Sequence, residues 1–323
     1  MPPERIDRLP PQERKELPVR VGYVFPGQAS QVVTMGLEFF QSSPAAKRAF
    51  EEANETLGFD LSEIIFKGPK ETLENTINAQ PALLTVSFAA HEALKERLGD
   101  ETPTPELVAG HSVGTLAALV VAKVLTFRDG VKVARERGRL MEQASKEHPG
   151  GMAAILELDE LALDHICAET GVEIANFNSD DQVVISGDRE RIAMAMDLAL
   201  QRGARNAIRL PVSAAFHSRH MRRAKIGFQD VIAGVSFAEP QVPIIANSSA
   251  EILTDRDKIK EELINGVCMP VRWKQSVKVM TKSGITLVYE FGPGRVLTNL
   301  AKGIPNLNAI AINSLKSLNE FAS

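Results

Sequence analysis

The sequence predicts an α/β protein in which a parallel-sheet body carries a small inserted domain with its own sheet. Three observations lead to this prediction. Short apolar strands alternate with longer helical segments along most of the 323 residues. The expected order of elements changes at Gly150-Gly151, where a strand-rich segment of about sixty residues begins. Alternation of strands and helices then resumes after residue 212, which is the order expected when one domain interrupts another.

The body begins with a strand that runs into a tight turn. Residues 1–18 hold five prolines among charges and predict a solvated arm. Residues 19–25 alternate apolar with small or polar side chains and stop at Pro26-Gly27. Gly99 fits a C-terminal helix cap. The elements expected up to residue 149 are helices 44–57, 69–78 and 81–98, strand 107–110, and helices 113–124 and 129–146.

The inserted segment, residues 150–212, has the β-α-β-β-α-β order of a ferredoxin-like domain. Its expected elements are 152–156, 161–170, 172–177, 182–186, a helix from Asp188 to a stop at Gly203, and 205–212. The body resumes with segments 243–246, 259–265, 273–281, 286–291 and 309–313. The predicted domains are therefore an arm (1–18), a body (19–149 and 213–323) and the insertion (150–212).

Composition excludes several classes of function. The formal net charge is −4 and the pI is about 6.0, so no overall basic field favours nucleic acid. No apolar run approaches the ~18 residues that span a bilayer, and the first residues lack the apolar stretch of a secretion signal. Two cysteines cannot form a disulfide framework, and no Cys/His cluster has zinc-ligand spacing. We expect a cytoplasmic, metal-independent protein.

The strongest local signal is Gly110-His-Ser-Val-Gly114, between an apolar strand and an apolar helix. In a G-x-S-x-G elbow the serine lies on a sharp turn, and this turn exposes its hydroxyl at the start of the helix. This motif makes the body α/β-hydrolase-like and Ser112 a candidate nucleophile. The alternative is a turn of small residues, because so short a pattern also arises by chance.

A serine nucleophile needs a base, and the chain has six histidines. His111 neighbours the serine, but on an elbow its ring points away from the hydroxyl, which favours packing. His217 and His220 lie where a strand gives way to a loop, and such places carry reactive groups in α/β bodies. Spacing alone leaves these two nearly equal. A metal pair is set aside because no suitable third ligand adjoins them.

Seven motifs in order carry a family resemblance. They are 25–31 (FPGQASQ), 110–114 (GHSVG), 137–138 (RG), 176–179 with 182–187 (NFNS, QVVISG), 215–218 (AFHS), 270–273 (PVRW) and 291–297 (FGPGRVL). Together they resemble the malonyl-CoA:acyl carrier protein transacylases of fatty-acid synthesis and the related acyltransferase domains of polyketide synthases. The resemblance runs from about residue 19 to about residue 313.

The resemblance implies roles for the reacting groups. Ser112 would be the nucleophile and His217 the base, while Gln28 and the backbone N–H of Val113 would form the oxyanion hole. Arg137 would hold the malonyl carboxylate, since a guanidinium can donate two parallel hydrogen bonds. Without the resemblance, the sequence favours the interpretation of Arg137 as a surface arginine paired with Glu136 or Glu142.

The resemblance also implies supporting roles. Asn178 would line the pocket, and Phe216 would crowd an α-methyl branch of the substrate. The carbonyl of Gly266 would orient the histidine in place of an acidic third residue. Three positions depart from the usual pattern. Gly266 fills a slot often held by glutamine, so only the role of its carbonyl is retained. Thr115 stands where glutamate is common, which indicates an altered contact, and Ala29 replaces a frequent glycine, which is tolerable only if its φ is negative.

The implied reaction is a ping-pong transfer of malonyl from malonyl-CoA to the phosphopantetheine thiol of an acyl carrier protein. Coenzyme A and the carrier arm are then substrates, and no bound cofactor is expected. A candidate docking patch for an acidic carrier is Arg219, Arg222, Arg223 and Lys225. The alternative functions are an acyl hydrolase, a polyketide-type acyltransferase with the same Ser-His pair, and a non-catalytic carrier-docking subunit. A monomer is expected because no exposed apolar stripe indicates an interface.

Overall fold

The structure is a computed structural model that describes residues 19–321, so the predicted arm lies outside the described residues. Its larger sheet has the order β10-β9-β1-β2-β7-β8. The first five strands are mutually parallel, and only β8 runs antiparallel to its neighbour. The strand bounds are β1 Val21–Phe25, β2 Leu107–Gly110, β7 Ile244–Ile245, β8 Ile252–Leu253, β9 Leu287–Phe291 and β10 Asn308–Ile312. The predicted α/β class is confirmed.

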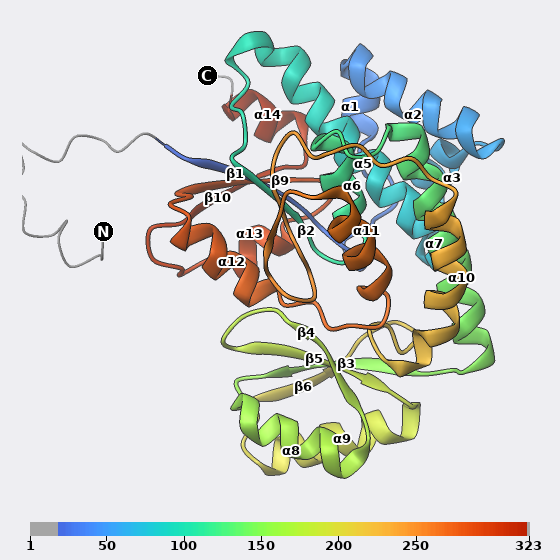
Figure 1. Cartoon of the computed structure of the whole chain (residues 1–323), viewed down its shortest axis with the longest axis vertical. Coiled ribbons are helices and arrows are strands. Elements are labelled where there is room, and N and C mark those ends of the chain that lie inside the picture. The colour runs from blue at the N-terminus through green and yellow to red at the C-terminus, as the bar shows by residue number, and fades with distance from the viewer. Residues whose placement is uncertain (1–18, 322–323) are drawn as a thin grey trace, which may run out of the picture.

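Helices cover both faces of this sheet, because successive side chains of a strand point to opposite sides. In β1, Tyr23 and Phe25 pack into the larger core, whereas Val24 packs on the other face against α12 and α13. Figure 1 shows the helices of the larger core grouped on one side of the sheet. The helices of the body are α1 Leu37–Ser42, α2 Pro44–Leu57, α3 Leu61–Lys67, α4 Lys70–Glu74, α5 Thr76–Leu98, α6 Gly114–Val121, α7 Phe127–Glu147, α10 Arg222–Ala233, α11 Arg256–Asn265, α12 Trp273–Lys282, α13 Val296–Leu300 and α14 Leu315–Phe321.

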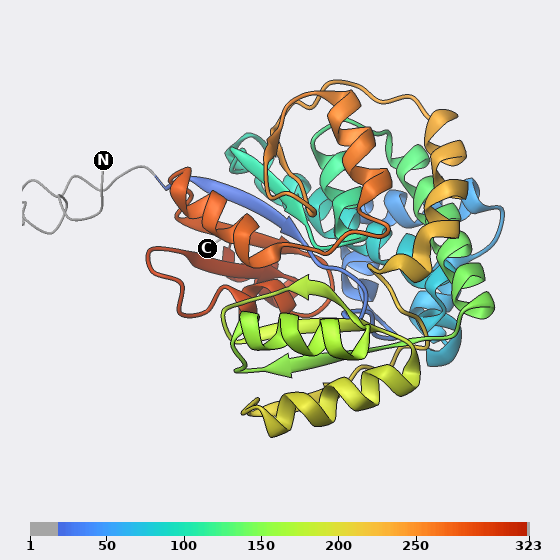
Figure 2. The ribbon, with the colours of Figure 1, turned by 60° about the horizontal axis from the view of Figure 1, so that its bottom comes forward.

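A second, antiparallel sheet of order β4-β5-β3-β6 lies below the body in Figure 1, and Figure 2 shows its two helices on the side away from the body. Its elements are β3 Gly151–Leu156, α8 Glu160–Thr170, β4 Glu173–Phe177, β5 Gln182–Gly187, α9 Arg189–Gln201 and β6 Asn206–Arg209. This is the predicted ferredoxin-like order. The domain boundaries at residues 150 and 212 stay a prediction.

The predicted helices 69–78 and 81–98 both have wrong boundaries. The first of them, α4, already ends at Glu74. The sequence predicts a helix starting at Pro81, but α5 already begins at Thr76 and passes through the proline. A proline inside a helix has no N–H to offer to the carbonyl four residues earlier, here that of Ile77. The guanidinium of Arg135 donates to that carbonyl at 3.1 Å, so the orphaned acceptor is satisfied from α7.

Candidate active site

The nucleophile elbow lies at the carboxyl end of β2. Ser112 has φ 52°, a left-handed conformation that is uncommon for a residue other than glycine. The flanking glycines are required by close packing. A Cβ on Gly110 would lie 2.0 Å from the carbonyl carbon of Gly114, and one on Gly114 would lie 2.1 Å from the carbonyl oxygen of Phe25. The motif therefore folds into a tight turn at the start of α6.

The structure brings the predicted serine and histidine into contact. Ser112 Oγ lies 2.8 Å from His217 Nε2, although 105 positions separate them in the chain. His217 is 5% exposed and is itself left-handed, with φ 54°. His220 makes no such contact with the serine, since its ring faces Asp188 at 3.7 Å. Geometry thus separates two histidines that spacing left nearly equal.

Two backbone carbonyls act on His217, the expected one of Gly266 and also that of Met269. His217 Nδ1 lies 3.0 Å from the carbonyl oxygen of Met269, in the turn after α11. Gly266 caps α11 in a helical conformation, φ −60° and ψ −12°, three residues before Met269. The backbone carbonyls of Met269 and Gly266 both raise the pKa of His217, and the role expected of Gly266 stays a prediction.

Burial is the main cause that lowers the pKa of His217, to about 3. The charge of Arg137 and the ring of His111 lower it further, and the two backbone carbonyls oppose this trend. The imidazole is therefore neutral at pH 7, with Nε2 directed at the serine hydroxyl. A neutral imidazole in that position can accept a proton.

Arg137 lies inside the protein, 4% exposed, and does not pair with a surface glutamate. Its Nη1 donates to Oε1 of Gln80 at 2.8 Å, and its Nη2 lies 3.4 Å from Ser112 Oγ. Burial lowers the pKa of Arg137 to about 10, so the guanidinium stays charged at pH 7. The interpretation of Arg137 as a surface arginine is wrong. Glu136 pairs instead with Arg139 at 2.9 Å.

The loop after β1 holds Gln28, whose side chain is engaged elsewhere. Its Nε2 donates to Thr76 Oγ1 at 3.0 Å, at the start of α5. The next residue, Ala29, has φ 80°, so the condition of a negative φ there is wrong. Ala29 holds this strained conformation while its N–H donates to Gln31 at 2.8 Å. Val113, the other expected oxyanion residue, is 2% exposed.

Asn178 joins the two sheets of the protein. Its Oδ1 lies 2.9 Å from His111 Nε2, and its Nδ2 donates to Gln182 at 2.8 Å. Because both ends of its amide are occupied, the role of Asn178 in a substrate pocket stays a prediction. Phe216 is 7% exposed within the larger core, next to the histidine, and its role as a pocket wall likewise stays a prediction.

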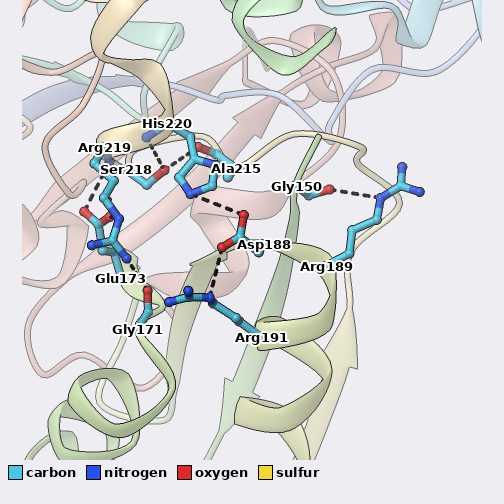
Figure 3. A network of polar contacts seen from close by, with 10 residues as sticks. All are labelled: Gly150, Gly171, Glu173, Asp188, Arg189, Arg191, Ala215, Ser218, Arg219 and His220. Atoms are coloured by element: carbon cyan, nitrogen blue, oxygen red, sulfur yellow. Dashed lines mark hydrogen bonds and ion pairs between the residues drawn. The ribbon is translucent and has the colours of Figure 1, made fainter. Parts of the chain in front are cut away.

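The segment that carries the histidine is fastened to the small sheet (Figure 3). Arg219 reaches Glu173 of β4 at 3.1 Å and also donates to the carbonyl of Gly171. His220 faces Asp188, which in turn pairs with Arg191 at 3.1 Å. The small domain thus supports the loop that presents His217.

Two residues near the site were not singled out by sequence reasoning. Gln80 is fully buried in α5 and holds Arg137. Asn247 follows β7 and contacts the elbow. Neither belongs to a motif, although the position of Asn247 just after a strand of the parallel sheet is a usable signal.

Within residues 19–321, no three His, Cys, Asp or Glu side chains are grouped so as to hold a metal ion. Over the same residues, no helix is both long and apolar enough to cross a bilayer.

The chain matches the acyl transferase domain family over residues 22–303. It is 41% identical to the malonyl CoA-acyl carrier protein transacylase of Bacillus subtilis strain 168, covering 94% of this chain and 99% of that protein. The Escherichia coli K12 protein of the same name is 38% identical, over 90% of this chain and 95% of that one.

Solved structures with a similar fold carry the same kind of name. An acyl-carrier-protein-S-malonyltransferase from Bartonella henselae superposes with a TM-score of 0.90 at 35% identity, over 94% of this chain and 98% of that one. A malonyl-transacylase in complex with its holo type II polyketide synthase acyl carrier protein gives 0.89 at 36% identity, over 93% and 98%.

Proposed function

Since the chain belongs to the malonyl-CoA:acyl carrier protein transacylases of the acyl transferase family, we propose that it transfers malonyl through an ester on Ser112. The observation that supports this mechanism is that the Ser112 hydroxyl lies between a base, His217, and a cation, Arg137. Ser112 Oγ lies 2.8 Å from a neutral imidazole nitrogen and 3.4 Å from a guanidinium nitrogen. Malonyl-CoA carries a thioester and a free carboxylate, which match these two groups.

In the first half-reaction, His217 Nε2 accepts the Ser112 proton while Oγ attacks the thioester carbonyl. The tetrahedral intermediate then collapses, the carbon–sulfur bond breaks, and the imidazolium gives its proton to the sulfur of coenzyme A. A malonyl-serine ester remains. Arg137 holds the malonyl carboxylate throughout, which places the carbonyl carbon within reach of Oγ.

We assign the oxyanion to the backbone N–H of Val113 and to Gln28, whose side-chain amide has a second N–H besides the one donated to Thr76. The start of a helix presents N–H groups without helical partners, and Val113 directly precedes α6. The N–H of Ser112 is already donated to Asn247, so Val113 offers the next donor along the elbow. Loss of one such donor commonly costs on the order of 10²–10³ in rate.

In the second half-reaction, the phosphopantetheine thiol of the carrier protein attacks the ester. His217 accepts the thiol proton, and the same proton returns to Ser112 Oγ as the carbon–oxygen bond breaks. Coenzyme A and the carrier arm are substrates, and no step of this cycle requires a further cofactor.

For the carrier we propose the basic patch along η3 (Arg219–Met221) and α10. Arg219 and Arg223 are held in ion pairs with Glu173 and Glu147, at 3.1 and 2.8 Å. Arg222 and Lys225 form no ion pair within the described part of the chain. Burial raises the pKa of Cys268, and the charges of Lys225 and Arg222 oppose this rise, so both lie near the turn that holds His217. An acidic carrier is expected to be attracted to this place.

Intact-mass measurement tests the mechanism. The protein is incubated with malonyl-CoA and then with a phosphopantetheinylated carrier. We expect a malonyl adduct that moves to the carrier, and no adduct on Ser112→Ala. Rapid release of free malonate would indicate a hydrolase, and no adduct on the wild-type protein would indicate a docking subunit.

Charge reversal tests the patch separately. Arg222→Glu with Arg223→Glu should raise the KM for the carrier while the rate of acylation by malonyl-CoA stays unchanged. Lys225→Glu is expected to act in the same direction. Unchanged carrier kinetics would remove the patch from the mechanism.

A further inference from the structure

Asn247 connects a neighbouring strand to the nucleophile elbow. It lies two residues beyond β7, which pairs in parallel with β2, so the carboxyl ends of the two strands are adjacent. The side chain is 8% exposed. Its Oδ1 accepts the N–H of Ser112 at 2.8 Å, and its Nδ2 donates to the carbonyl of Gly110 and to Thr115 Oγ1, both at 2.8 Å.

The Asn247 amide thus hydrogen-bonds to residues before and after the serine as well as to the serine N–H. The conformation at Ser112 is strained, and a residue strained in this way persists only where surrounding contacts impose the conformation. An amide suits the task because the elbow presents one donor and two acceptors, and an amide supplies the complementary set. Thr115 completes the ring, since its hydroxyl also donates to the Gly110 carbonyl at 3.2 Å.

The loop that carries Asn247 is held in turn by α11. Next to Asn247, the backbone N–H of Ser248 donates to Oε1 of Glu262 at 2.7 Å, and the Ser248 hydroxyl donates to the other carboxylate oxygen. Glu262 also lines a small cavity beside Ser112, together with Asn247. Both ends of the Glu262 carboxylate are therefore used to hold the loop that carries the amide.

The same loop is tied to the segment that orients the base. The backbone N–H of Arg272 donates to the carbonyl of Asn247 at 2.7 Å. Three residues earlier, the Met269 carbonyl meets His217 Nδ1 at 3.0 Å. One short stretch of backbone thus links the group that holds the serine to the group that holds the histidine.

We propose that Asn247 is a positioning residue for the transfer reaction, and that it fixes Ser112 Oγ within hydrogen-bond distance of His217 Nε2. Glu262 supports it by holding its loop. The proposal rests on Ser112 being the nucleophile. It predicts an effect on the chemical step, because the amide touches the elbow and not the carboxylate-binding guanidinium.

The test compares Asn247→Ala and Asn247→Asp with the matched control Asn54→Ala. Asn54 is a half-buried amide in α2 that also clasps a loop: it accepts the N–H of Ser62 at 3.1 Å and donates to Asp60 at 3.0 Å. The measurements are the single-turnover rate of acylation by malonyl-CoA, followed by intact mass, the KM for malonyl-CoA and the Tm.

For Asn247→Ala we expect acylation about 10–100-fold slower, because a misplaced nucleophile loses the geometry of attack. The KM should change less than twofold. Asn247→Asp should be similarly slow, since a carboxylate cannot donate to the Gly110 carbonyl. Asn54→Ala should lower the Tm and leave acylation at the wild-type rate.

Should Asn247→Ala fail to fold, two other variants test the same hydrogen bonds. Thr115→Val removes an acceptor of the Asn247 amide, and Glu262→Ala removes the carboxylate that holds the Asn247 loop. Each should slow acylation several-fold. Wild-type acylation by the folded Asn247 variants, or an equal fall in Asn54→Ala, would overturn the proposal. An adduct that persists on Ser112→Ala would instead refute the nucleophile, so the two failures are distinguishable.

Discussion

Replacing Arg137 by alanine should convert a selective malonyl transferase into a weak and less selective acyltransferase. The guanidinium lies 3.4 Å from Ser112 Oγ and is 4% exposed, so water cannot substitute for it when a carboxylate is bound. Since burial lowers the pKa of Arg137 only to about 10, the charge is present at pH 7 and available to the substrate.

The expected magnitude follows from the contacts that Arg137 can make. Nη1 is held by Gln80, which leaves Nη2 and the remaining N–H groups for the malonyl carboxylate. A hydrogen bond to a charged group contributes about 1.5–3 kcal/mol. Even one such bond corresponds to roughly tenfold to over a hundredfold in kcat/KM, at 1.4 kcal/mol per factor of ten.

The assay compares malonyl-CoA with acetyl-CoA, which has the same thioester but no carboxylate. Arg137→Ala should lose at least tenfold in kcat/KM with malonyl-CoA and little or nothing with acetyl-CoA. Arg135→Ala is the matched control, because Arg135 lies on the same helix but bonds to Ile77 and Asn78 of α5. An equal loss with both thioesters would refute carboxylate recognition by Arg137.

Four further outcomes are expected. His217→Gln should slow acylation about 10²–10⁴-fold, whereas His220→Gln should keep most of the activity; the reverse would exchange their roles. Because the pKa of His217 is lowered to about 3, kcat/KM for malonyl-CoA should not fall between pH 8 and 5. Acetyl transfer by Arg137→Ala should fall at a higher pH than in the wild type, because a charge that lowers this pKa is gone; an unshifted profile would contradict the coupling. Gly138→Ala should lower the Tm and malonyl transfer together, since its Cβ would lie 2.5 Å from a backbone oxygen of α5; a wild-type Tm would contradict this.

Much of the fold is predictable because its signals are local. Strand β2 and the elbow after it are predicted from an apolar run followed by closely spaced glycines, and a side chain at either glycine would overlap backbone atoms. The start of α5 is not predictable in this way. Pro81 is tolerated inside the helix because Arg135, more than fifty residues later, satisfies the carbonyl that the proline leaves free.

In the site, too, residues with a local signal are predictable and residues placed by tertiary contacts are not. Ser112 is predictable from its own turn, but the choice of His217 over His220 depends on which ring the loop turns inward. That choice is made by a left-handed residue and by contacts to Glu173 and Asp188 on another domain. Sequence periodicity carries no information about such contacts.

Supporting groups are the hardest to predict because they act through the backbone or from distant elements. The Met269 carbonyl that meets His217 is not predictable from the sequence, because any residue type offers a carbonyl. Gln80 and Asn247 are single amides without a motif. Their importance follows only from what they touch, which is a buried guanidinium in one case and a strained serine in the other.

The depressed pKa of His217 links substrate choice to chemistry. Burial and the charge of Arg137 both disfavour the imidazolium, so in the empty site His217 is a weak base. In the proposed mechanism, a malonyl carboxylate bound to Arg137 offsets that charge and raises the basicity of His217 when a thioester is in place. An acyl group without a carboxylate leaves the charge uncompensated. In the proposed mechanism, Arg137 therefore favours malonyl in two ways, because it binds the carboxylate and because the bound carboxylate makes His217 a stronger base.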